Sequence, residues 1–168
     1  IARLGSGLDI IDLPAARKKG VEVISAPEGN CKAVAEHALG FILSLINKFP
    51  LAHESVVKQL WYREANRGRE LSQMIVGVIG FGHTGSSLTK LIDGWASKIL
   101  VYDPYVEVDI SSFKSVEQVD KLSALQKNAD IISFHVQLTE ETEYMMDADF
   151  INKCKNGVFV INTSRGKV

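Results

Sequence analysis

Three glycines in the middle of the sequence have the spacing of a dinucleotide-binding turn. Residues 80–85 read Gly-Phe-Gly-His-Thr-Gly; an apolar run precedes them and a helical pattern begins inside them. In such a turn Gly80 permits the tight bend, Gly82 lets the backbone approach a pyrophosphate, and Gly85 lets helix and strand pack closely. The spacing therefore predicts a phosphate site at a helix N-terminus.

Asp103 ends the next strand-like run and suits the acidic residue of such a unit. Its carboxylate would accept hydrogen bonds from a ribose diol and repel the 2′-phosphate of NADP, which favours NAD as cofactor. The plainer interpretation is that the glycines only form a tight turn and that Asp103 begins a turn with Pro104. Strand, turn, helix, strand and acid occur in the required order, so we predict dinucleotide binding.

Arg165 belongs to a polar segment, Asn-Thr-Ser-Arg-Gly, that follows the apolar run 158–161. Ligands of open parallel sheets bind beyond the carboxyl ends of the strands, so Arg165 should project towards the same crevice as the glycine turn. A guanidinium offers a two-pronged donor for a carboxylate and polarises a neighbouring carbonyl. From position alone, a surface arginine on a loop is an equally good interpretation.

His135 ends another strand-like run at the same edge and is a candidate acid–base residue. A histidine in this position is as often part of a cofactor cleft or a core, so we assign it no catalytic role. No pair of histidines has metal-ligand spacing, and no nucleophile elbow or Ser-His-Asp pattern occurs. We predict no metal site.

The composition narrows the function classes. The chain has 168 residues, a net charge of -1, 46% hydrophobic residues and 23% charged residues. The absence of a basic cluster argues against nucleic acid as a partner, and no apolar run is long enough to span a membrane. Cys31 and Cys154 are far apart and outside any Cys-x-x-Cys spacing, which indicates reduced thiols in a cytoplasmic protein.

The first half of the sequence predicts a small strand–helix–strand unit followed by two helices. Asp12 should cap a short helix that Gly20 ends, and the strand Val21–Ser25 should follow. The break at residues 27–30 is a candidate domain crossing. Helical spacing from Cys31 predicts one apolar stripe: Val34, Ala38, Phe41, Ile42, Leu45 and Phe49. A second helix after Pro50 is marked by Val56, Val57, Leu60 and Trp61.

The second half predicts an α/β fold with a parallel sheet covered on both faces. Near-continuous apolar runs alternate with helical patterns, as buried parallel strands require. The expected strands are 75–80, 99–102, a weak strand 113–116, 131–136 and 158–161. The expected helices contain Leu88, Leu91, Ile92 and Trp95; then Leu122 and Leu125; then Phe150 and Ile151, capped by Asp147 and ended by Gly157.

With these residues in view, the chain resembles the D-isomer-specific 2-hydroxyacid dehydrogenases. The resemblance covers all 168 residues and is carried by five motifs in order. They occupy residues 2–9, 26–40, 78–85, 135–139 and 161–166. The resemblance implies a doubly wound Rossmann-type sheet, truncated at its C-terminal end (27–168), preceded by the remnant of a flavodoxin-like substrate domain (1–26).

The resemblance also implies roles for single residues. Arg165 matches the catalytic arginine that holds the 2-oxo acid and orients its carbonyl towards the nicotinamide. Asp103 matches the adenosine-ribose acid, and the loop 4–7 matches a substrate-domain loop that lines the active site. The implied cofactor contacts are Ser6, Gly80, Gly82, His83, Thr84, Gly85, Asp103, Val136, Thr163, Ser164 and Arg165.

The sequence departs from the family pattern in two ways. Gln137 stands where members usually have proline, which should affect loop stiffness more than chemistry. The family's catalytic glutamate and the histidine it orients lie beyond Val168, and His135 does not match that histidine. Both ends look cut, and we expect the 168-residue chain to bind NAD at best and to turn nothing over.

The resemblance implies an NAD-dependent oxidoreductase acting on a D-2-hydroxy acid. The 3-phosphoglycerate dehydrogenases of serine biosynthesis are the subfamily most like it. Glyoxylate, hydroxypyruvate or D-lactate reductases are an alternative within the family, and a dinucleotide-sensing corepressor-like scaffold is an alternative of another class. As in relatives, the helix 31–49 is a candidate homodimer interface.

Overall fold

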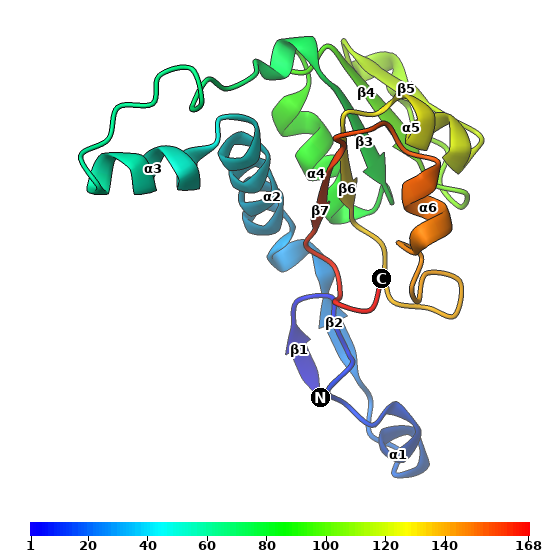
Figure 1. The fold of residues 1–168 in the computed structure, drawn as a ribbon. Coiled ribbons are helices and arrows are strands. Elements are labelled where there is room, and N and C mark those ends of the chain that lie inside the picture. The colour runs from blue at the N-terminus through cyan, green and yellow to red at the C-terminus, as the bar shows by residue number, and fades with distance from the viewer.

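The computed structural model describes residues 1–168 as one large and one small parallel sheet with flanking helices (Figure 1). The large sheet has five strands in the order β5-β4-β3-β6-β7, all parallel to their neighbours. Its strands are β3 (Ile75–Ile79), β4 (Lys98–Tyr102), β5 (Val116–Gln118), β6 (Ile131–Phe134) and β7 (Phe159–Asn162). The central strands β3 and β6 are almost wholly buried, which explains their unbroken apolar sequences.

The strand order places a topological switch at β3. From β3 the chain moves outwards through β4 to β5, and then returns to the other side of β3 as β6 and continues to β7. This is the doubly wound arrangement in which ligands bind at the carboxyl ends of the strands, where the order reverses. The loops after β3, β6 and β7 are therefore the ones that can form a site.

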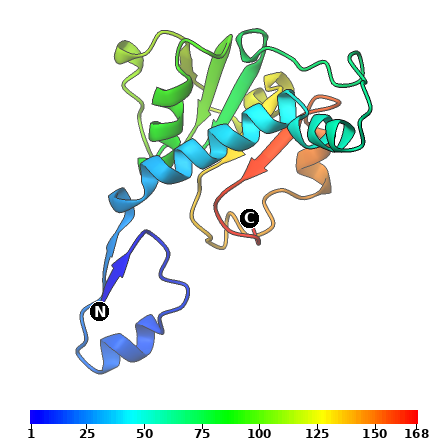
Figure 2. The ribbon, with the colours of Figure 1, turned by 90° about the vertical axis from the view of Figure 1, so that its left-hand side faces the viewer.

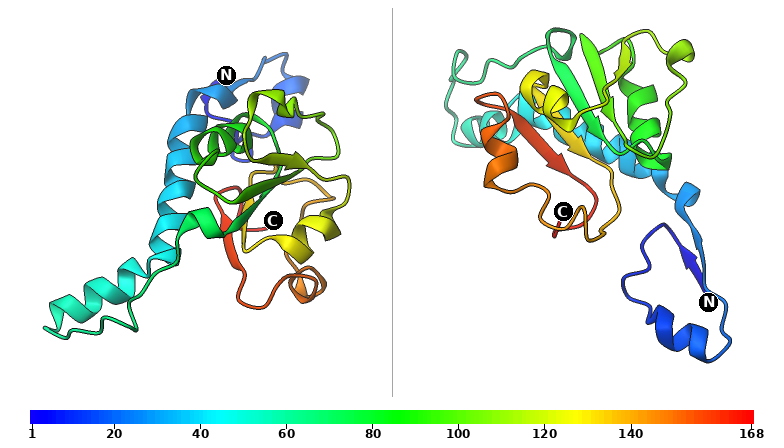
Figure 3. Two further views of the ribbon diagram at one scale, coloured as in Figure 1. Left: turned by 90° about the horizontal axis from the view of Figure 1, so that it is seen from above. Right: turned by 90° about the vertical axis from the view of Figure 1, so that its right-hand side faces the viewer.

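Helices cover both faces of this sheet. On one face α2 (Cys31–Ile46) packs against α4 (His83–Ile92), and both share a core of 16 buried residues with β3, β4, β6 and β7. On the other face α5 (Leu122–Asn128) and α6 (Ala148–Asn152) enclose a second core of 8 residues. Figure 3 (left) shows α2 on one side of the strands and α5 and α6 on the other.

The buried face of α2 differs from the predicted stripe. Ala38 and Ile42 are buried as predicted, but Phe41 is 44% exposed and Leu45 39% exposed, while Ala35 and Ile46 are buried instead. Helix α2 packs against α4 and the sheet (Figure 2), and the side of α2 that they cover decides which of its apolar residues are buried. The helix also ends at Ile46 rather than reaching residue 49.

A second helix, α3 (Phe49–Val57), stands away from the sheet (Figure 1). Lys48 has φ +54°, so the chain turns sharply there and Phe49 begins the new helix, with Pro50 in its first turn. Leu60 and Trp61 lie beyond the helix, contrary to prediction, and Trp61 is 84% exposed. The connector then includes a short 3-10 turn, η2 (Leu71–Gln73).

Residues 1–26 form a separate two-stranded parallel sheet with one helix. Strand β1 (Ala2–Leu4) pairs with β2 (Ile24–Ala26), and α1 (Leu13–Lys18) connects them. Asp12 caps α1 as predicted, accepting a 2.9 Å hydrogen bond from the Ala15 amide. The second strand begins at Ile24, three residues later than the β-branched run suggested. The turn η1 (Pro27–Gly29) leads from this sheet into α2 (Figures 1 and 2).

Element ends in the large sheet shift by a few residues from the prediction. Trp95 follows the end of α4 and is 56% exposed, and β5 begins at Val116 after the 3-10 turn η3 (Ile110–Ser112). Helix α6 ends at Asn152, and Gly157 (φ +76°) forms the turn into β7. Strand β6 stops at Phe134, so His135 lies in the loop that follows it. No helix has the length and apolar character needed to cross a membrane.

Candidate functional site

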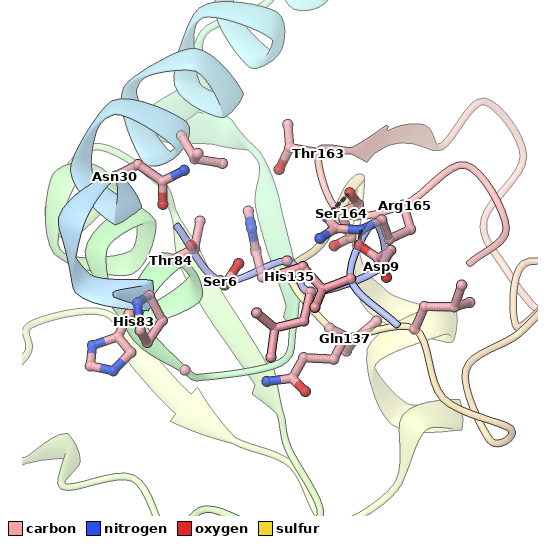
Figure 4. Close-up of a pocket in the computed structure, with 18 of the residues that line it drawn as sticks. Ser6, Asp9, Asn30, His83, Thr84, His135, Gln137, Thr163, Ser164 and Arg165 are labelled. Carbon is pink, nitrogen blue, oxygen red and sulfur yellow. Dashed lines mark hydrogen bonds and ion pairs between the residues drawn. The ribbon is translucent and has the colours of Figure 1, made fainter. Parts of the chain in front are cut away.

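A cleft of about 840 Å³ opens at the carboxyl ends of β3, β6 and β7, facing the loop that follows β1 (Figure 4). Its walls come from five segments of the chain, within residues 6–14, 27–34, 82–84, 135–138 and 163–165. The polar and glycine residues that line it are Ser6, Gly7, Asp9, Asp12, Asn30, Gly82, His83, Thr84, His135, Gln137, Thr163, Ser164 and Arg165. Figure 4 shows His83 and Thr84 on one side of this cleft and Arg165 with Asp9 on the other.

In the turn after β3, the space around the Cα atom differs for each of the three glycines. Gly80 has φ +90°, and a Cβ there would lie 2.7 Å from the carbonyl oxygen of His135. A Cβ on Gly85 would lie 2.0 Å from the carbonyl oxygen of Gly80, so helix and turn could not pack. A Cβ on Gly82 would meet nothing within 4 Å, because Gly82 faces the cleft. The turn therefore keeps open space beside the start of α4.

The N-terminus of α4 presents free backbone donors to that space. The first helical hydrogen bond runs from the Ser86 amide to the Gly82 carbonyl, and no side chain caps the helix. The amides of His83, Thr84 and Gly85 consequently have no carbonyl partner within the helix. Together with the partial positive charge of the helix end, they form a site that suits a phosphate group.

Asp103 stands at the end of β4 and is tied to the glycine turn. One carboxylate oxygen accepts a 2.7 Å hydrogen bond from the Phe81 amide, and the other accepts a 2.9 Å hydrogen bond from the Tyr105 amide. Both oxygens keep free lone pairs. Asp103 does not line the cleft itself but fixes the turn that does. Beside it, the Tyr105 hydroxyl donates to Glu141 in the loop after β6.

Arg165 reaches from the loop after β7 to the loop after β1. Its Nε donates to Oδ2 of Asp9 at 2.7 Å, and its Nη1 donates to the carbonyl of Ser164 at 2.9 Å. A Cβ on Gly7 would lie 1.9 Å from Nη2, so any larger residue there would displace the guanidinium from this position. The hydrogen bond and charge of Arg165 lower the pKa of Asp9. Three of the five guanidinium N–H groups remain available.

Two polar atoms buried beside the cleft have no hydrogen-bond partner in the protein: Oγ1 of Thr163 and Nδ1 of His135. The other ring nitrogen of His135 is 2.9 Å from the Ser133 hydroxyl, and burial lowers the pKa of His135 to about 4. The ring is therefore neutral at neutral pH and is a poor proton carrier there. Unpaired buried polar atoms next to a cleft are the groups that a ligand would satisfy.

The cleft gathers most of the residues predicted from sequence. Gly80, Gly85 and Asp103 do not line it but shape the turn from behind. The Ser164 hydroxyl donates to the Phe134 carbonyl at 2.9 Å, so it anchors its loop. The predicted residues that line the cleft are Ser6, Gly82, His83, Thr84, Val136, Thr163, Ser164 and Arg165.

Sequence reasoning missed Asp9 and Asn30. Asp9 belongs to the first of the five motifs, and Asn30 lies at the crossing into α2, so both stood in segments already singled out. Only the folded chain shows that Asp9 reaches Arg165.

The architecture and the cleft can be compared with known proteins. A family model for the NAD-binding domain of D-isomer-specific 2-hydroxyacid dehydrogenases matches residues 39–168. The chain belongs to this family. The family, the Rossmann-type sheet and the NAD cofactor that the motifs implied are thereby confirmed.

Several 2-hydroxyacid dehydrogenases are similar over the whole chain. A hydroxypyruvate reductase of Thermotoga maritima is 40% identical over 167 residues, 99% of this chain and 53% of that protein. A D-3-phosphoglycerate dehydrogenase of Synechocystis is 36% identical over 168 residues, 100% of this chain and 30% of that protein. The structure of Aquifex aeolicus D-lactate dehydrogenase, complexed with NAD and lactic acid, has a TM-score of 0.88 at 34% identity and covers 98% of this chain and 50% of that one.

The chain thus spans about half or less of the length of these relatives. The cleft has features that suit NAD: three free amides at α4, open space at Gly82 and an unpaired hydroxyl on Thr163. These features come from the chain's own geometry and agree with the family's cofactor.

Proposed function

We propose that this chain is part of an NAD-dependent dehydrogenase that interconverts a D-2-hydroxy acid and its 2-oxo acid. One observation carries the proposal: Arg165, with three free N–H groups, stands in the same cleft as the glycine turn and the free amides of α4. A cleft with a phosphate site at one side and a carboxylate-binding fork at the other suits a dinucleotide and an acid substrate together.

Each side of the cleft has its own task in this proposal. The backbone amides of His83 and Thr84 hold the pyrophosphate, and Asp103 accepts the adenosine-ribose hydroxyls. Ser6, Val136, Thr163 and Ser164 enclose the nicotinamide end, where the unpaired Oγ1 of Thr163 supports a polar contact. NAD, when bound, supplies the hydride acceptor.

Arg165 acts on the substrate. Its guanidinium binds the carboxylate of the acid and polarises the oxygen at C2, while Asp9 keeps the side chain in place. Orientation in the cleft supplies much of the rate in this account. We assign the proton transfer to a group other than His135, because burial leaves His135 with a pKa of about 4.

For the substrate, we propose 3-phosphoglycerate first. Several D-3-phosphoglycerate dehydrogenases match at least 99% of this chain at 35–36% identity, which supports this choice. The 40% identity to a hydroxypyruvate reductase favours hydroxypyruvate as the second candidate. The corresponding 2-oxo acids, phosphohydroxypyruvate and hydroxypyruvate, differ in a phosphate, so the residues that distinguish them would have to bind a dianion.

A substrate panel tests the proposal. The full-length protein with NADH should reduce phosphohydroxypyruvate with a higher kcat/KM than hydroxypyruvate, glyoxylate or pyruvate. A preference for hydroxypyruvate would replace the first substrate by the second and keep the enzyme class. NADH binding without turnover of any 2-oxo acid would contradict the dehydrogenase and favour a dinucleotide-sensing scaffold.

We also propose that the protein forms a homodimer whose interface covers the outer side of α2 and α3. Phe41, Leu45, Phe49 and Leu51 are between 39% and 57% exposed on these helices. An apolar surface of this kind indicates a protein partner, and a second copy is the simplest one. Sedimentation of the full-length protein should give a dimer that Leu51→Asp weakens; a monomeric unaltered protein would refute this assignment.

We propose finally that residues 1–26 belong to the substrate domain and 27–168 to the NAD-binding domain. Residues 1–26 contribute no side chain to either core of the large sheet, which supports the division.

A further inference from the structure

The side-chain amide of Gln137 lies in the cleft and has no hydrogen-bond partner in the protein. Gln137 is exposed and follows β6 in the loop that lines the cleft. Its backbone N–H likewise has no protein partner. In Figure 4 the Gln137 side chain lies along the cleft between His83 on one side and Arg165 on the other.

The loop around Gln137 is fixed. The backbone carbonyl of Gln137 accepts a 2.5 Å hydrogen bond from the Thr142 hydroxyl. The same hydroxyl accepts a 2.8 Å hydrogen bond from the Thr139 amide. These bonds close a turn over residues 137–142, so the backbone of Gln137 is held before any ligand arrives. A ligand then has only the rotamers of one side chain to order, which lowers the entropic cost of binding.

The same loop presses against the glycine turn. A Cβ on Gly80 would come within 2.7 Å of the His135 carbonyl oxygen and 3.0 Å of a Val136 methyl group. Gln137 therefore starts directly beside the turn whose helix offers free amides to a phosphate. Any dinucleotide phosphate held by those amides lies next to this loop.

We propose that the Gln137 side chain binds the nicotinamide-side phosphate and ribose of the dinucleotide, the part that lies between the amides of α4 and Arg165, and so helps to set cofactor affinity. Its NH₂ group donates to a phosphate or ribose oxygen, and its backbone N–H is free to add a second donor. The proline that the family resemblance leads us to expect here offers neither group. The inference rests on the proposed binding of NAD in this cleft.

The test compares ligands that contain different parts of NAD. Gln137→Leu keeps the size of the side chain and removes its hydrogen bonds; Gln137→Glu keeps the shape and adds a negative charge. Gln73→Leu, at an exposed position in η2 outside the cleft, is the matched control. Dissociation constants of NADH, ADP-ribose and AMP are measured with the full-length protein, and melting temperatures confirm folding.

We expect Gln137→Leu to weaken the binding of NADH and ADP-ribose roughly fivefold, which is the effect of one lost hydrogen bond. The dissociation constant of AMP should stay within about twofold of that of the unaltered protein. Gln137→Glu should weaken the binding of NADH and ADP-ribose further, because a carboxylate repels the pyrophosphate. Unchanged NADH affinity in Gln137→Leu would overturn the inference, and so would an equal loss for AMP, because the contact would then lie on the AMP half of the cofactor and not on the nicotinamide-side phosphate and ribose. If the unaltered protein bound no NADH, the proposed function would fall, and this inference with it.

Discussion

Nε of Arg165 lies 2.7 Å from Oδ2 of Asp9, which joins two segments 156 residues apart in the sequence. The pair is partly open to solvent, with 37% and 54% of the two side chains exposed, so its main effect is on position rather than stability. It uses the Nε side of the guanidinium and leaves most of the other N–H groups for a ligand. Asp9 therefore acts as a positioning residue for Arg165.

Removing Asp9 should disturb the arginine without removing it. In the full-length enzyme we expect Asp9→Ala to lower kcat/KM about 10- to 100-fold, because a small displacement of a catalytic group has effects of this size. Asp9→Asn keeps a hydrogen-bond acceptor and should lose less. Steady-state kinetics distinguish the two variants, and NADH affinity should stay unchanged. Equal losses in both variants would mean that charge, and not position, is the contribution of Asp9.

Two substitutions in the turn after β3 test the stability of the fold and the binding of NADH separately. Gly82→Ala adds a methyl group to open space, so its melting temperature should stay within about 2 °C of the unaltered protein. NADH binding should fall, because that space is where a phosphate would approach. Gly85→Ala forces a Cβ to 2.0 Å from a carbonyl oxygen and should cost about 1 to 3 kcal/mol of stability. Full NADH affinity in Gly82→Ala would show that the phosphate lies elsewhere.

Asp103 should control the choice between NADH and NADPH. Asp103→Asn keeps a single oxygen acceptor, so only one of the Phe81 and Tyr105 amides retains its hydrogen bond, and the melting temperature shows whether the turn holds. The loss of charge should weaken the binding of NADH by about 1 to 3 kcal/mol, or roughly 5- to 150-fold. It should also reduce the difference in affinity between NADH and NADPH. Fluorescence titration with both cofactors measures this difference. Equal binding of the two cofactors by the unaltered protein would refute the role of Asp103.

His135 gives the fold a defined pH dependence. Its folded pKa is about 4, below the ordinary value of 6.5, because burial disfavours the charged ring. As the pH falls from about 6.5 to about 4, the unfolded chain takes up a proton that the folded chain does not. Stability should therefore fall by about 3 kcal/mol across this window. Urea unfolding at several pH values measures it, and His135→Asn should remove most of the slope; an unchanged slope would mean that other groups cause it.

Much of this structure was predictable because its signals are local. The glycine turn and the Asp12 and Asp147 caps depend on residues a few positions apart, and each lies where its spacing predicts. Strand ends were harder to predict: Val21 and Val23 have the branched side chains of a strand but lie outside β2, because pairing with β1 decides where the strand begins.

Features that depend on distant contacts were not predictable. Phe41 and Leu45 have helical apolar spacing, yet α4 covers the neighbouring face of α2 and leaves them exposed. The contact of Asp9 with Arg165 exists only because the chain returns to the first loop after folding the whole sheet. From sequence, Gln137 in place of proline was expected to affect mainly the stiffness of its loop, whereas the structure places its side-chain amide in the cleft.

In the proposed mechanism Arg165 binds the substrate and not the cofactor. This role is tested most directly in the full-length protein by Arg165→Ala and Arg165→Lys, with kcat/KM for the preferred 2-oxo acid and the dissociation constant of NADH measured on the same samples. We expect Arg165→Ala to lower turnover by about 100- to 1000-fold or more. Arg165→Lys should recover only part of it, because an ammonium cannot form the two-pronged contact, and NADH affinity should be retained. Turnover unchanged by Arg165→Ala would contradict the account.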